Sequence, residues 1–400
     1  MTMTKTPMAG MMLAAMFLSG AFTAAAQSLY PDQLREIESN NPLLHARHAA
    51  SEAAAGDALT GLGLPDPEVG VSYLFGAPRE VPNETDLEIS QGFDFATLSG
   101  AKKRAAEAEG RVTRATYAVS RAEILLQAEK ALIGYAFQQA LIREMETRKS
   151  RIADMLKAAG DLLASNTISR LEYNKIELEY FAATNELDMA RIDLEAARRE
   201  VEALNGGRGL ALPSEWPVAS LPADFEAWLA ESSSRSAELQ VLRAQLDKSM
   251  QDVNLRKKEG LPGFSIGYAA QLVKDNNYHG PSLSVSVPLW ANRGRVNAAK
   301  AIQMASELEL QTAEDQYRLM KQTQYERARR LEKAYSDMQD LYAHIAASNE
   351  VYLKKALDSG KITVLEYMTE KEDFYAHAIK FLETRRDYLL ARAELYAETL

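Results

Sequence analysis

Two histidines of this sequence stand at a spacing that suits metal binding. His45 and His48 are three residues apart, and a helix places residues at that spacing on one face. Two imidazoles on one face can hold a metal ion such as Zn²⁺. Without a pair of carboxylates beside them, however, two ligands make a weak site. The other three histidines are scattered, so we expect neither a bound metal nor a cofactor.

The sequence contains no recognisable arrangement of catalytic residues. The chain contains no cysteine, which excludes thiol nucleophiles and disulfides. It also lacks a glycine-rich phosphate loop and a zinc-binding pattern. The formal net charge is −10, and this argues against nucleic acid, whose binding needs clustered Lys and Arg. We therefore expect a protein that is not an enzyme.

The first residues have the pattern of a secretory signal peptide. Lys5 supplies the positive charge, residues 8–22 form a short apolar stretch, and three alanines at 24–26 provide small residues at the cleavage position. We expect residues 1–26 to be removed. An uncleaved membrane helix is the alternative, but the apolar stretch is shorter than the roughly 20 residues that a span needs. No later stretch is long and apolar enough to be a membrane helix.

The rest of the chain is a duplicated unit. Residues 165–173 match residues 359–367 at a constant offset of 194. Asn166 and Gly360 hold equivalent places, and these residue types adopt the left-handed conformation at the lowest cost. Each copy is therefore predicted to end a helix at this point. Ser169 and Thr363, as N-cap candidates, then begin the next one.

Long helices precede both turns. Residues 100–165 and 295–359 are rich in Ala, Glu, Leu, Arg and Lys, and contain no proline. At 1.5 Å per residue each helix would be roughly 95 Å long. Heptad spacing of apolar residues after the second turn predicts coiled-coil packing against neighbours. The returning helices are predicted at 169–204 and 363–398. Front helices predicted at 31–57 and 225–258 fill the remaining length.

Each copy also contains a predicted β-hairpin, at about 67–95 and about 263–290. Apolar residues alternate with small or polar ones over about ten residues per strand, which is the length and pattern of a transmembrane barrel strand. A soluble sheet with one buried face is the alternative. The predicted lipid-facing residues are Val69, Val71, Tyr73, Leu87, Ile89, Phe93, Phe264, Ile266, Tyr268, Leu283, Val285 and Val287. Four strands cannot close a barrel, so several protomers must share one.

The layout resembles the TolC-type outer-membrane efflux family over nearly the whole chain after residue 26. The motifs that carry the resemblance are Pro65-Asp66-Pro67-Glu68, Gln91-Gly92-Phe93, Ser99-Gly100-Ala101-Lys102, Ser286-Val287-Pro288-Leu289-Trp290, Asn292-Arg293-Gly294-Arg295 and Gly360-Lys361-Ile362-Thr363-Val364-Leu365-Glu366. The first of them is similar to the heavy-metal cation branch. The resemblance implies a fold that is mainly α with a small β part, in which duplicated helical hairpins form a coiled-coil α-barrel. Four strands per chain join a trimeric, twelve-stranded transmembrane β-barrel.

The resemblance also implies partners and site residues. The homotrimer is expected in the outer membrane, in contact with lipid, with its helical tunnel in the periplasm. There it would meet a periplasmic adaptor protein and an inner-membrane pump. Glu366, Thr369 and Glu370 are the expected aperture residues, whereas a latching basic residue of the family falls on Ile362. The predicted adaptor contacts at the tip turns are Asn166, Ile168, Leu171, Glu172, Gly360, Ile362 and Leu365.

We therefore expect a passive exit channel of a tripartite efflux or type I secretion system. A periplasmic adaptor and a coiled-coil scaffold without channel activity are the alternatives, although an adaptor would have one helical hairpin between β-rich modules. The predicted organisation is a first repeat at 27–204, a linker at 205–222 and a second repeat at 223–400. A carboxylate ring at Glu366 would favour cations, but an acid near a helix N-terminus is favoured anyway.

Overall fold

Two helices of equal length set the dimensions of the molecule. The computed structural model describes residues 28–78, 80–213, 216–217, 219–290 and 292–400, so the predicted signal peptide lies outside the described residues. Helices α4 (Ala101–Ala164) and α8 (Arg295–Asp358) have 64 residues each, or about 96 Å at 1.5 Å per residue. The predicted lengths of both helices are confirmed.

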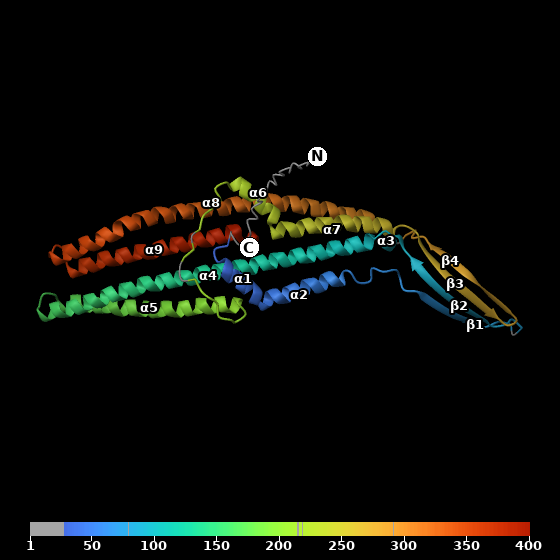
Figure 1. Cartoon of the computed structure of the whole chain (residues 1–400), viewed down its shortest axis with the longest axis horizontal. Helices are drawn as coiled ribbons and strands as arrows, with labels where there is room; N and C mark the ends of the chain where they lie inside the picture. The colour runs from blue at the N-terminus through green and yellow to red at the C-terminus, as the bar shows by residue number, and fades with distance from the viewer. Residues whose placement is uncertain (1–27, 79, 214–215, 218, 291) are drawn as a thin grey trace, which may run out of the picture.

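The long helices and their return helices form one layer. Helices α5 (Arg170–Leu204) and α9 (Val364–Tyr396), the latter followed by a short turn of 3₁₀ helix at Ala397–Thr399, run back from the two tips. Contacts between α5 and α4, α4 and α9, and α9 and α8 place the helices side by side in that order (Figure 1). Within the described part of the chain, no helix is long and apolar enough to cross a membrane.

The front helix of each repeat is broken in two, where one continuous helix was predicted. The four pieces are α1 (Pro31–Asn40), α2 (Pro42–Asp57), α6 (Phe225–Arg235) and α7 (Ala237–Glu259). Asn41 leaves the helical conformation and its side chain accepts a hydrogen bond from the backbone N–H of Leu44 at 3.0 Å. Ser236 does the same for Leu239 at 3.3 Å. Each break is therefore a local N-cap that starts a new helix.

One antiparallel sheet stands at the end of the helical layer (Figure 1). Its strands β1 (Glu68–Leu74), β2 (Glu84–Phe93), β3 (Gly263–Val273) and β4 (Asn276–Ser286) pair in that order. The first hairpin ends slightly earlier than predicted, because Asp94 caps a short helix, α3 (Phe95–Leu98). The second hairpin also ends earlier, at Ser286. The turn of the second hairpin is short, because β3 ends at Val273 and β4 begins at Asn276. The chain reverses at residues 274–275, where Asp275 has a φ of 77°, and the polar residues after it extend β4.

A large cluster of buried apolar side chains lies where α1, α4 and α9 meet, and we call this part of the molecule the waist. Leu132 and Ile133 of α4 and Leu389 of α9 lie at its centre, each almost completely buried. Leu34 and Ile37 of α1 pack against them, as do apolar residues of the segment between the repeats, such as Trp216. The segment that joins the repeats therefore crosses the helices and is held to them by apolar contacts.

Candidate functional site

The two tip turns have the same geometry. Asn166 has a φ of 57° and Gly360 a φ of 67°. The N–H of Asn166 donates to the Leu163 carbonyl at 3.0 Å, and the N–H of Thr167 donates to the Leu162 carbonyl at 2.8 Å. The second turn repeats both bonds, so each helix ends in a Schellman motif. The predicted left-handed caps are confirmed.

A capping box follows each turn. The Glu366 carboxylate accepts hydrogen bonds from the backbone N–H of Thr363 at 2.8 Å and from its hydroxyl at 3.0 Å. Glu172 makes the equivalent bonds to Ser169. The backbone and hydroxyl donors lower the pKa of both glutamates below the ordinary value of 4.5. Glu366 is therefore a charged group with a fixed orientation at the tip.

The other predicted tip residues differ in their surroundings. Thr369 and Glu370 are exposed on α9 one turn beyond Glu366, and the Thr369 hydroxyl donates to the Leu365 carbonyl at 3.1 Å. Leu171 is 79% exposed, which leaves a large apolar side chain open at the first tip. Ile168 instead packs beside a small buried cluster formed by Ala159, Ile176 and Met368. That cluster joins the start of α9 to the first hairpin.

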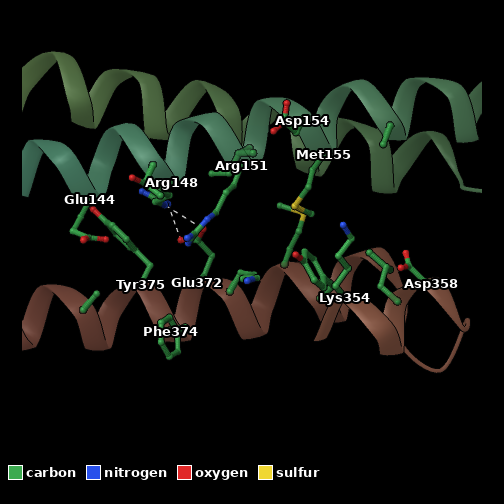
Figure 2. A pocket seen from close by; sticks show the side chains of 18 of the residues that line it. Glu144, Arg148, Arg151, Asp154, Met155, Lys354, Asp358, Glu372, Phe374 and Tyr375 are labelled. Carbon is green, nitrogen blue, oxygen red and sulfur yellow. Dashed lines mark hydrogen bonds and ion pairs between the residues drawn. The ribbon is translucent and has the colours of Figure 1, made fainter. Parts of the chain in front are cut away.

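Further from the tips than this cluster, Arg148 of α4 connects its own helix to α5 and α9. Its guanidinium lies 2.5 Å from a carboxylate oxygen of Glu186 on α5 and 2.8 Å from one of Glu372 on α9. It also lies 4.7 Å from the ring centroid of Tyr375, and its side chain is only 11% exposed. Figure 2 shows Arg148 reaching from α4 toward Glu372. The hydrogen bonds to these carboxylates outweigh desolvation and raise the pKa of Arg148.

The Arg148 group borders a cavity of about 670 Å³ between α4, α8 and α9. Aromatic rings and charges of both signs line it, including Tyr375, Asp154 and Lys354 (Figure 2). Sequence reasoning missed this site. Arg148 is one arginine among many in a helix, and its partners lie on other helices, so no spacing along the chain reveals it.

The sheet has one apolar face. Cross-strand pairs such as Val69 with Ile89, Ile89 with Tyr268 and Ile266 with Leu283 place eleven of the twelve predicted lipid-facing residues on the same side. The twelfth, Val287, lies just beyond the end of β4. Val69 is 72% exposed and Leu283 is 74% exposed. Phe93 and Phe264, at the helical end of this face, are less exposed than the others. Their half-buried rings stack with centroids 5.7 Å apart.

The opposite face of the sheet is acidic. Glu84, Asp86 and Glu88 alternate along β2 and share this face with Glu68 of β1. Serines and glycines of β3 and β4 fill much of the remaining surface. The Ser72 hydroxyl donates to Asp86 at 3.2 Å, and the Gln271 amide donates to Glu84. These acids were not predicted as a site, although their alternation with the apolar residues of β2 is visible in the sequence.

The two histidines do not form a metal site. The His45 ring pairs with the Ser39 carbonyl at 2.9 Å. The His48 ring meets Tyr117 edge-on, with centroids 5.1 Å apart. Among the described residues, no group of three or more His, Cys, Asp or Glu side chains could hold a metal ion.

Known proteins share this architecture. No protein-family model and no curated protein matches the sequence. A membrane protein of Pseudomonas aeruginosa matches with a TM-score of 0.75 and 12% identity over 93% of this chain and 92% of its own. The Campylobacter jejuni CmeC outer-membrane channel matches with a TM-score of 0.68 and 11% identity, over 92% and 85%. The open MtrE outer-membrane channel of Neisseria gonorrhoeae matches with a TM-score of 0.69 and 15% identity, over 93% and 89%.

At these identities the likeness is one of fold. It extends over nearly the whole length of both chains, so it includes the sheet, both long hairpins and the waist. The chain therefore has the fold of the TolC-type outer-membrane channels, and the predicted fold class is confirmed.

Proposed function

We propose that this chain is the channel subunit of an outer-membrane export machine and that it works as a homotrimer. The observation that carries the proposal is the sheet, which exposes a largely apolar face and, among the described residues, leaves both outer strands unpaired. Exposed apolar patches of this extent are rare on soluble proteins. Strands of up to 11 residues are long enough to cross the apolar part of a membrane when tilted.

The unpaired strands explain why one copy is insufficient. The free backbone groups of β1 and β4 would each cost several kcal/mol in hydrocarbon. Pairing β1 of one copy with β4 of the next removes that cost. Three copies of four strands make a closed barrel of twelve, in keeping with the even strand numbers of bacterial barrels.

The helical layer supports the same assembly. Helices α5 and α8 form its lateral edges, and both expose large apolar side chains. Leu178 of α5 and Val351 of α8 lie at similar distances from their tips, and so do Met189 and Leu341. All four are exposed. An α5 edge placed against the α8 edge of a neighbour would bury these pairs and close a tubular wall.

The proposed machine conducts without catalysis. Residues 27–204 and 223–400 each supply one strand pair and one helical hairpin, after residues 1–26 direct export. The tip turns face a periplasmic adaptor, through Asn166, Ile168, Leu171, Glu172, Gly360, Ile362 and Leu365. An inner-membrane pump supplies the energy. Glu366, Thr369 and Glu370 border the aperture, and the acidic face of the sheet lines the exit toward the outside.

Membrane fractionation and bilayer recordings test the proposal. We expect the protein in the outer-membrane fraction, as a trimer that migrates differently on gels before and after boiling. Purified trimer should give discrete conductance steps in planar bilayers. A periplasmic monomer, or a membrane trimer without conductance, would contradict the proposed function. The variants Val71→Lys and Ser72→Lys, on opposite faces of β1, separate misfolding from failure to insert.

A further inference from the structure

A basic surface lies where the sheet meets the helices. The junction segments 93–104, 256–263 and 287–300 contain nine basic and two acidic residues, in a chain of net charge −10. Six of these cations are exposed and define what we call the basic collar: Lys103, Arg104, Lys257, Arg293, Arg295 and Lys300. The fourth junction, residues 57–68, adds three acids, Asp57, Asp66 and Glu68. Basic residues still outnumber acidic ones over the four junctions together.

The three junctions are held together. The Asn292 amide donates to the Arg256 carbonyl at 2.8 Å and ties the segment before α8 to the end of α7. Helix α3 packs against both α4 and α7. Lys102 binds Asp94 at 3.0 Å, next to the start of α3. The three junctions therefore lie together at the helical end of the sheet (Figure 1), and the collar residues belong to these junctions.

Internal interactions do not account for the collar. Within the described residues, the side chains of Lys257, Arg293, Arg295 and Lys300 make no hydrogen bond or ion pair. Cations at a helix N-terminus are also disfavoured by the helix dipole. The first turns of α4 and α8 nevertheless contain no acidic residue. Only Lys257, in the last turn of α7, is placed where the dipole favours it.

Apolar side chains border the collar on the sheet side. Trp290 is 77% exposed and Leu289 is 66% exposed, just after the end of β4. Phe95 and Leu98 of α3 are exposed as well. An exposed tryptophan between an apolar band and a row of cations has the composition of a membrane interface. The apolar face of the sheet continues directly into this border through Val287.

We propose that the basic collar binds the anionic head groups of phospholipids in the membrane leaflet on the helical side of the sheet. This inference rests on the proposed insertion of the sheet in a membrane. With the apolar face in hydrocarbon and Trp290 at its border, the collar lies at head-group depth. Lys and Arg at that depth attract phosphate through charge and hydrogen bonds. Binding there would fix the depth and tilt of the barrel.

Spin-labelled lipids in vesicles of phosphatidylcholine test the proposal. For the trimer, we expect phosphatidylglycerol to associate on the order of three times more strongly than phosphatidylcholine, and salt to reduce the difference. The variant K257Q/R293Q/R295Q/K300Q should lose the preference. A control with the same charge change on α8, R329Q/R330Q/K333Q/K355Q, should keep it, because these residues lie far from the sheet.

Two results would overturn the inference. One is equal association of the two lipids with the wild-type trimer; the other is an equal effect of the collar variant and its control. Conductance in vesicles of pure phosphatidylcholine separates a failure of the lipid-binding inference from a failure of the proposed channel function. A trimer that conducts there without any lipid preference refutes only the lipid-binding collar. A protein that neither inserts nor conducts refutes the channel.

Discussion

At the residue scale, Glu366 has two explanations that the capping box makes separable. Its carboxylate starts α9 by accepting bonds from Thr363, and Glu172 does the same for α5. A structural role therefore applies equally to both glutamates. A role at the aperture applies to Glu366 alone, because only the second tip was predicted to border the opening.

We predict that Glu366→Gln lowers the cation selectivity of the channel, while Glu172→Gln leaves it nearly unchanged. Glutamine keeps the capping box but removes the charge. Reversal potentials in a salt gradient measure the difference. Because hydrogen bonding lowers the pKa of Glu366, its charge and its capping contribution persist above pH 4.5 and are lost as the pH falls through the lowered value. Equal effects of the two variants would leave Glu366 as a cap only.

Arg148 supports a prediction about local stability. Arg148→Met leaves the Glu186 and Glu372 carboxylates without their shared partner, which should cost about 1–2 kcal/mol of local stability. Amide exchange at the start of α9 should then accelerate by about 5- to 30-fold. Arg191→Met is the matched control, because Arg191 also joins α5 to α4, through Glu146 at 3.0 Å, but both side chains are half exposed. Unchanged exchange in Arg148→Met would show that Arg148 does not hold α9.

At the element scale, the features that the sequence could predict are those with a local signal. Helix lengths follow from heptad periodicity, and the tip turns follow from Asn166 and Gly360. The breaks at Asn41 and Ser236 also have local signals, because each is an N-cap residue and Pro42 directly follows the first. The front helices were predicted without breaks because their length matched the space left beside the long helices. The three-helix contact of Arg148 has no local signal, since it depends on how distant segments pack.

The two faces of β1 allow a prediction with neighbouring residues. Val71 lies on the apolar face and Ser72 on the acidic face. Val71→Lys should place a charge in hydrocarbon at about 2–4 kcal/mol per protomer near the middle of the membrane. The yield of heat-modifiable trimer in the outer membrane should drop. Ser72→Lys should be tolerated beside Asp86. Equal yields of the two variants would argue that this face does not meet lipid.

At the scale of the whole molecule, both ends must close in the same assembly. The sheet presents β1 and β4 as open edges, and the helical layer presents α5 and α8. The sheet and the helical layer therefore each have one open edge in the first repeat and one in the second. A head-to-tail ring satisfies both pairs of edges at once. A symmetric dimer would pair one edge with the same edge of its partner, for example β1 with β1, and would leave the opposite edge, β4, open.

The absence of cysteine from the chain makes this ring testable by cross-linking. Met189→Cys combined with Leu341→Cys should join α5 of one protomer to α8 of the next, because both residues are exposed at similar distances from their tips. Oxidised membranes should yield covalent trimers and nothing larger, since a ring of three is closed. The mismatched pair Met189→Cys and Val351→Cys, offset by about 15 Å along α8, should cross-link poorly. Ladders beyond the trimer would contradict a closed ring, and covalent dimers alone would favour a symmetric pair.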